Sequence, residues 1–174
     1  MSKLLTSHRP ALGALAFVLL LSTPALAALP LDSAPASFGV TDRTVALAVH
    51  GEGAQIYQCK ADAEGRLVWT FREPIAALIA EDGRIVGRHF AGPTWEVDGG
   101  GAVKGQLSTS APAATPSDIP ILKLTATDHR GAGALSAVTV ILRLNTHGGV
   151  FKGTCAVAGD LRAEPYSADY VFLR

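Results

Sequence analysis

Short runs of alternating apolar and polar residues, separated by turns rich in glycine and proline, constrain the fold of this chain most strongly. The clearest run spans residues 138–145, where every second side chain is apolar, and similar runs occupy 67–72 and 121–128. A period of two is the pattern of a half-buried strand, and no long run has helical spacing. We therefore predict an all-β domain, an antiparallel β-barrel or β-sandwich of roughly eight to ten short strands.

Glycine and proline positions predict where these strands end. Gly51 and Gly53 separate two alternating runs, 45–50 and 55–60, so we predict two strands joined by a turn. The run 74–80 is compatible with either one helical turn or a short apolar strand. Residues 109–120 contain three prolines and are expected to form a loop.

The N-terminus has the pattern of a secretory signal peptide over residues 1–27. Lys3 and Arg9 precede an apolar run at 11–21, and a small-residue cleavage pattern ends at Ala27. An uncleaved N-terminal anchor is the alternative, although the apolar run is short for a membrane span. We expect residues 28–174 to form a single all-β domain, with 28–40 as an extended leader. After cleavage no membrane span is expected, and the protein would be periplasmic or extracellular.

The charge balance limits the kinds of partner. The chain has 15 Lys and Arg against 15 Asp and Glu, and only 17% of its residues are charged. A nucleic-acid-binding protein needs a basic surface that displaces counterions from phosphate. A balanced composition argues against nucleic acid, and it supplies no polybasic patch for an anionic membrane. The partner is therefore expected to be a small ligand or another protein.

The chain contains two cysteines, Cys59 and Cys155. Export would carry both into an oxidising compartment, where an even number of cysteines favours disulfide formation. We predict one disulfide that joins an early strand to a late segment. Two buried thiols without a bond are the alternative.

The highest density of reactive side chains lies in residues 87–98, Gly-Arg-His-Phe-Ala-Gly-Pro-Thr-Trp-Glu-Val-Asp. His89 and Glu96 are candidates for a general base and the carboxylate that orients it. The two residues are seven positions apart, so in one straight strand their side chains would lie on opposite faces. A bulge at Gly92-Pro93 could shift the register by one and bring them together. The sequence leaves open whether they share a face.

Aromatic residues are the stronger candidates for ligand contact. Trp95 follows the bend expected at Gly92-Pro93, which would place its ring near a rim where a ligand can reach it. Tyr57 could line the same pocket or barrel mouth, beside His89 and Glu96. A rim tryptophan could be removed with little loss of stability. The histidines have no metal-site spacing and no phosphate-binding motif follows the glycines at 99–101, so neither metal nor cofactor is expected.

Several segments together resemble the domain-of-unknown-function family 3455, and the similarity spans nearly the whole chain after residue 27. The run Ala-Gly-Pro-Thr-Trp-Glu at 91–96 is the most specific of them. The resemblance implies a small exported protein with one early and one late cysteine, and it implies no activity. The matching segments are 55–61, 89–96, 110–112, 119–120, 138–139, 143–149, Cys155 and 165–170.

Three functions remain compatible with these observations. The leading hypothesis is an exported β-domain that binds a small ligand or partner near residues 87–98, through Trp95, His89, Glu96 and Tyr57. The first alternative is a secreted hydrolase that uses His89 and Glu96. The second is a structural envelope or matrix protein, for which we expect a fully packed interior and an exposed apolar patch.

Overall fold

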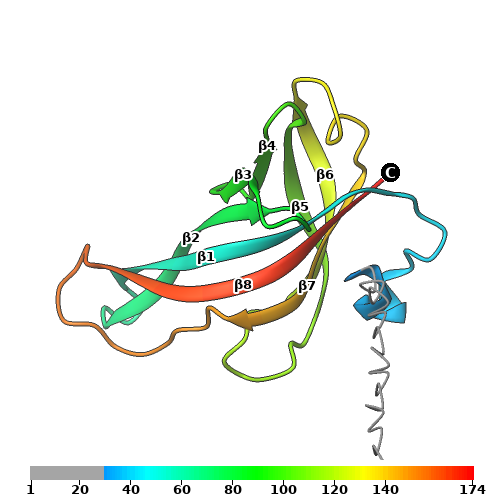
Figure 1. The fold of residues 1–174 in the computed structure, drawn as a ribbon. Coiled ribbons are helices and arrows are strands. Elements are labelled where there is room, and N and C mark those ends of the chain that lie inside the picture. Colours follow the sequence, from blue (N-terminus) through cyan, green and yellow to red (C-terminus); the bar gives the residue numbers. More distant parts are fainter. Residues whose placement is uncertain (1–29) are drawn as a thin grey trace, which may run out of the picture.

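The computed structural model describes residues 30–174, so the predicted signal peptide lies outside the described residues. Eight strands form a single antiparallel sheet in which each strand pairs with the next and β8 returns to pair with β1, closing a barrel (Figure 1). The all-β prediction is confirmed, and the barrel is the correct alternative. The strands are β1 (Val45–Ala61), β2 (Leu67–Ile79), β3 (Ile85–Phe90), β4 (Thr94–Val97), β5 (Gly101–Ala111), β6 (Ile121–Arg130), β7 (Val140–Gly148) and β8 (Leu161–Leu173).

The turn predicted at Gly51 and Gly53 is wrong, because β1 continues through both residues as one strand. Each glycine instead permits a close approach. A Cβ atom on Gly53 would lie 2.0 Å from the carbonyl oxygen of Ile75, and one on Gly51 would lie 2.5 Å from the ring of Tyr170. Glycine inside a strand pattern marks such contacts as well as turns. Of the two alternatives for the run 74–80, the strand is correct, because β2 continues through this run to Ile79.

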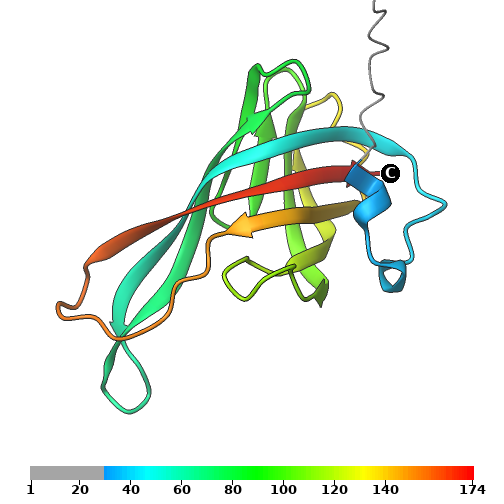
Figure 2. The same cartoon turned by 60° about the horizontal axis from the view of Figure 1, so that its bottom comes forward.

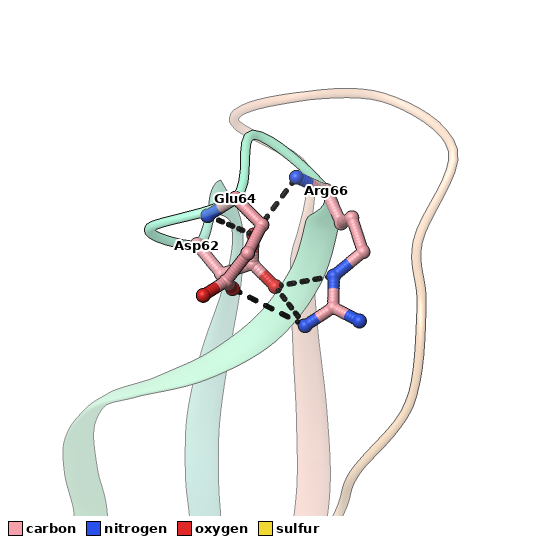
Figure 3. Close-up of polar contacts among 3 residues, drawn as sticks. All are labelled: Asp62, Glu64 and Arg66. Carbon is pink, nitrogen blue, oxygen red and sulfur yellow. Dashed lines mark hydrogen bonds and ion pairs between the residues drawn. The ribbon is translucent and has the colours of Figure 1, made fainter.

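Three strands extend beyond the barrel wall as an arm. In Figure 1, β1, β2 and β8 continue together past the ends of β3 and β7. Strand β3 pairs with β2 only over 76–79, and β7 pairs with β8 only as far as Tyr166. A polar turn closes the β1–β2 tip (Figure 3). There the Asp62 carboxylate accepts hydrogen bonds from the backbone N–H groups of Glu64 and Arg66 and from the Arg66 guanidinium.

Residues 149–160 connect β7 to β8 by way of the arm, and we call this segment the strap. The strap covers the free edge of β2, since the Trp69 N–H donates to the Gly153 carbonyl at 3.0 Å and the Cys155 N–H donates to the Leu67 carbonyl at 3.1 Å. A disulfide between Cys155 and Cys59 fastens the strap to β1. The predicted disulfide is therefore confirmed.

The N-terminal segment is not an extended leader. It forms two 3₁₀ turns, Pro30–Ser33 and Ala36–Phe38, that lie beside β7 and β8 (Figure 2). Phe38 and Val40 are buried against the outer face of these strands. A buried aromatic ring holds the segment because removing that ring from water is favourable. No helix in residues 30–174 is long and apolar enough to cross a membrane.

Two apolar cores share β7 and β8. The outer core lies under the N-terminal segment and contains Val140, Leu142 and Leu144. The inner core fills much of the barrel lumen and contains Ile141 of the same strand. The two faces of β7 are therefore both buried. The other inner residues with large side chains include Leu78, Trp95, Leu124, Tyr166, Tyr170 and Phe172.

Candidate functional site

The 87–98 stretch is a β-hairpin and not a single bent strand. Strands β3 and β4 pair antiparallel across a turn at 91–93, with His89 opposite Trp95 and Arg88 opposite Glu96. Residues directly opposite on neighbouring strands project to the same side of a sheet. His89 and Trp95 thus share the inner face. Glu96 lies on the outer face.

This register separates the two residues of the proposed acid–base pair. Glu96 is partly exposed, and its carboxylate accepts a hydrogen bond from the Arg88 guanidinium at 3.0 Å on the outer surface. His89 is 2% exposed. A general base and its orienting carboxylate need to be within hydrogen-bond reach, directly or through one water. The sheet lies between these side chains, so the structure does not bring them together.

His89 and Trp95 form a buried aromatic stack. Their ring centroids are 4.4 Å apart with an interplanar angle of 7°, and the Tyr170 ring packs against both. Trp95 is 1% exposed. The predicted position of Trp95 at a rim is therefore wrong. The hairpin directs the ring into the lumen, where it belongs to the inner core.

A single hydrogen bond sets the tautomer of His89. Its Nδ1 lies 2.9 Å from the carbonyl oxygen of Thr94. A carbonyl only accepts, so Nδ1 carries the proton and Nε2 is left as an acceptor in the neutral ring. Burial lowers the pKa of His89 to about 4, the Thr94 carbonyl opposes this shift, and the positive charge of Arg143 adds to it. At neutral pH His89 is uncharged.

The depressed pKa of His89 predicts that acid destabilises the fold. Well above pH 6.5 the imidazole is neutral in both the folded and the unfolded state. Between its ordinary pKa of 6.5 and its folded value of about 4, the unfolded chain binds a proton that the folded chain does not. Stability should therefore fall as pH decreases through this window, by up to about 3 kcal/mol in total. Urea unfolding from pH 7 to pH 4 measures the loss. His89→Gln should remove this component, and an identical pH dependence in that variant would contradict the assignment.

A pocket of about 580 Å³ opens beside the His89–Trp95 stack. This volume is within the usual range for a site that holds a small organic molecule. The turn at Gly92-Pro93 and the end of the proline-containing loop, Ile119-Pro120, form part of its wall. Apolar side chains supply most of the remaining lining, including Phe71, Leu122, Leu124, Val150 and Phe151.

Tyr57 also lines the pocket and connects β1 to the strap. Its hydroxyl donates to the Gly149 carbonyl at 2.7 Å and accepts from the Phe151 N–H at 3.2 Å. Of the four predicted ligand-contact residues, the structure brings Tyr57, His89 and Trp95 to one pocket. It places Glu96 outside that pocket.

Among the pocket residues that had not been identified from the sequence are Gln55 and Arg143. Gln55 on β1 is 2% exposed, and Arg143 on β7 projects toward the lumen. Alternation did place Arg143 on the same face as Ile141. The sequence does not show that the N-terminal segment covers the opposite face of β7. Without that knowledge the face with Ile141 and Arg143 could not be recognised as the interior. Gln55 was hidden because an isolated glutamine in a strand is usually exposed.

The pocket wall contains hydrogen-bond donors without a partner. The Gln55 side-chain nitrogen and the Trp95 indole nitrogen are buried, and neither finds an acceptor among residues 30–174. A buried donor left unsatisfied costs about 1–3 kcal/mol. Both nitrogens belong to residues that line the pocket. They are candidates to meet an acceptor on a ligand after a small side-chain adjustment.

Within residues 30–174 no group of three or more His, Cys, Asp or Glu side chains converges in a way that could hold a metal ion. The His50 imidazole pairs with the Asp169 carboxylate at 2.9 Å, and the His129 ring nitrogen Nε2 lies 2.8 Å from the Val138 carbonyl oxygen. The pocket itself offers apolar contact, neutral hydrogen bonding and the positive charges of Arg72, Arg143 and Lys152.

The fold and the pocket together define an eight-stranded up-and-down β-barrel with an apolar cavity among its strands. A family model described as "Protein of unknown function (DUF3455)" matches residues 40–174, and the chain belongs to this family. The match covers all eight strands and confirms the resemblance noted in the sequence. The comparison with curated proteins and the comparison with solved structures found no match.

Proposed function

We propose that this chain is an exported binding protein that holds a small, mainly apolar ligand in the lumen pocket. The pocket itself is the observation that carries the proposal, because a mainly apolar pocket of about 580 Å³ has the size of sites that hold a small organic molecule. A structural protein was expected to have a fully packed interior, so the pocket favours a binding role. The Cys59–Cys155 disulfide supports export, since such bonds persist in oxidising compartments.

Two further features support a binding role. The wall comes from several strands and from the strap, which the disulfide and backbone hydrogen bonds hold in place. A preformed wall loses little entropy when a ligand enters. In addition, Gln55 and Trp95 each have a buried hydrogen-bond donor without a partner in the described residues. A ligand that carries an acceptor would be oriented by a hydrogen bond from either donor.

Filling the pocket tests the proposal. We expect the wild-type protein to bind N-phenylnaphthylamine, a neutral dye whose fluorescence rises in apolar surroundings. Leu122 is half-buried in the pocket wall, and Leu122→Trp would place a larger side chain in the cavity. The affinity should fall by about tenfold or more, a change of at least 1.4 kcal/mol. Fluorescence titration gives both dissociation constants.

Leu107→Trp is the matched control. Leu107 is 58% exposed on β5 and does not line the pocket, so its replacement should leave dye binding unchanged. Failure of the wild-type protein to bind the dye, or equal affinities for the Leu122→Trp and Leu107→Trp variants, would contradict a ligand site in the lumen.

A further inference from the structure

Arg143 is a cation in the pocket wall without a carboxylate partner. It stands between Leu122 of β6 and Tyr170 of β8, and its Nε and Nη2 donate to the Pro120 carbonyl at 3.1 and 2.8 Å. No Asp or Glu within residues 30–174 forms an ion pair with it. Removing a guanidinium from water is unfavourable unless a negative charge or sufficient hydrogen bonds compensate. The Pro120 carbonyl and the Tyr170 hydroxyl both contact the guanidinium, but both are neutral, so the positive charge has no opposite charge beside it.

The neighbouring phenols cannot serve as the missing anion. The hydroxyls of Tyr166 and Tyr170 are 3.1 Å apart, and burial raises the pKa of both. Both therefore remain protonated near neutral pH. Burial also lowers the pKa of Arg143, but a guanidinium stays charged in proteins. His89 on the opposite wall is neutral at this pH.

The other charged residues that line the pocket are positive, like Arg143. The charged residues of the pocket are Arg72, Arg143 and Lys152, and no acidic side chain lines it. Glu73 pairs with Arg72 at 3.0 Å, whereas neither Arg143 nor Lys152 pairs with a carboxylate in the described part of the chain. The pocket is therefore apolar in its surface and positive in its charge.

We propose that the ligand is an anionic amphiphile, a molecule with an apolar body and a carboxylate head, and that Arg143 binds the head. This inference rests on the proposed function, because it assigns a chemical class to the ligand of the same pocket. Pro120 uses two of the guanidinium donors and Tyr170 contacts the group, so N–H donors remain for a ligand oxygen. The planar guanidinium fork matches a carboxylate, and the bond is charge-assisted. The apolar body would lie against Leu122, Leu124 and Phe151.

The test compares two ligands that differ only in the head group. Dodecanoate and dodecanol are titrated against the protein loaded with N-phenylnaphthylamine, and the ratio of their dissociation constants is recorded within each variant. The wild-type protein should prefer dodecanoate by about tenfold or more, as expected for a charge-assisted hydrogen bond. In Arg143→Gln this preference should fall to within about twofold. Arg143→Lys, which keeps the charge but loses the fork, should be intermediate.

Arg130→Gln is the control, because Arg130 is exposed at the end of β6 and does not line this pocket. It should retain the wild-type ratio. Dye binding without any preference for dodecanoate would overturn the anionic class and leave the proposed function intact. A preference that persists in Arg143→Gln would overturn the role of Arg143. If neither arginine variant folds, the wild-type protein is titrated with dodecanoate and with its uncharged methyl ester. Tighter binding of dodecanoate would support the anionic class of ligand, and equal binding would overturn it. If neither the dye nor either ligand binds, the proposed function fails.

Discussion

Replacing Trp95 with alanine should lower the free energy of unfolding by about 3–5 kcal/mol, as for other fully buried large aromatic residues. The ring is 1% exposed and contacts His89, Tyr170 and Phe172, so its removal leaves a cavity bounded by three rings. Urea unfolding followed by circular dichroism measures the loss. The sequence alone favoured a rim position and a small effect on stability. The hairpin register reverses that expectation.

Trp69→Ala provides a matched control. Trp69 lies on the arm, is half-buried, and packs its edge against Phe151 of the strap. It does not belong to either apolar core. The same substitution there should cost clearly less than at Trp95, since less surface returns to water. If the two variants lose equal stability, Trp95 is not the core residue that the structure shows.

The fold class could be predicted from the sequence because its signals are local. Alternation over 138–145 identifies a strand without reference to any other part of the chain, and β7 covers most of that run. The residues Asp82-Gly83 and 63–66 also have the local chemistry of turns, and the structure has turns at both places. Cys59 and Cys155 could be paired because the chain offers each cysteine only one partner.

The failures arise where a residue serves a distant contact. Gly51 and Gly53 have the same local pattern as a turn, but their lack of a side chain accommodates Tyr170 and the backbone of Ile75. Which of the two meets a ring and which meets a carbonyl depends on the register of β1 with β8 and β2. That register is set by the closure of the barrel, and no local sequence pattern contains it.

The candidate site could be predicted only in part, because its composition also depends on contacts between distant parts of the chain. His89, Trp95 and Tyr57 were selected by residue type, and they do lie together in the pocket wall. Glu96 was selected as the carboxylate that would orient His89, and the hairpin register places it outside the pocket. Arg143 was missed because it lies on the more polar face of β7, beside Asn145, and alternation assigns such a face to solvent. In the structure both faces of β7 are buried.

Removing the disulfide should produce the other large loss of stability. The bond joins residues 96 positions apart. On the chain-entropy model, a loop of this length stabilises the fold by up to about 4.7 kcal/mol, and measured values are often smaller. The double variant Cys59→Ala/Cys155→Ala should therefore unfold at a much lower urea concentration than the wild type. The wild type in a reducing agent should behave in the same way.

The loss should also reach the pocket, because the disulfide holds the strap that supplies Val150, Phe151 and Lys152 to its wall. We expect weaker binding of N-phenylnaphthylamine in the double cysteine variant under conditions where it is still folded. Leu142→Ala separates this effect from a general loss of stability, since Leu142 is fully buried in the outer core and should cost about 2–5 kcal/mol. That variant should keep its dye affinity while folded. Equal weakening in both would show that the pocket responds to overall stability, and that the strap has no particular role in forming it.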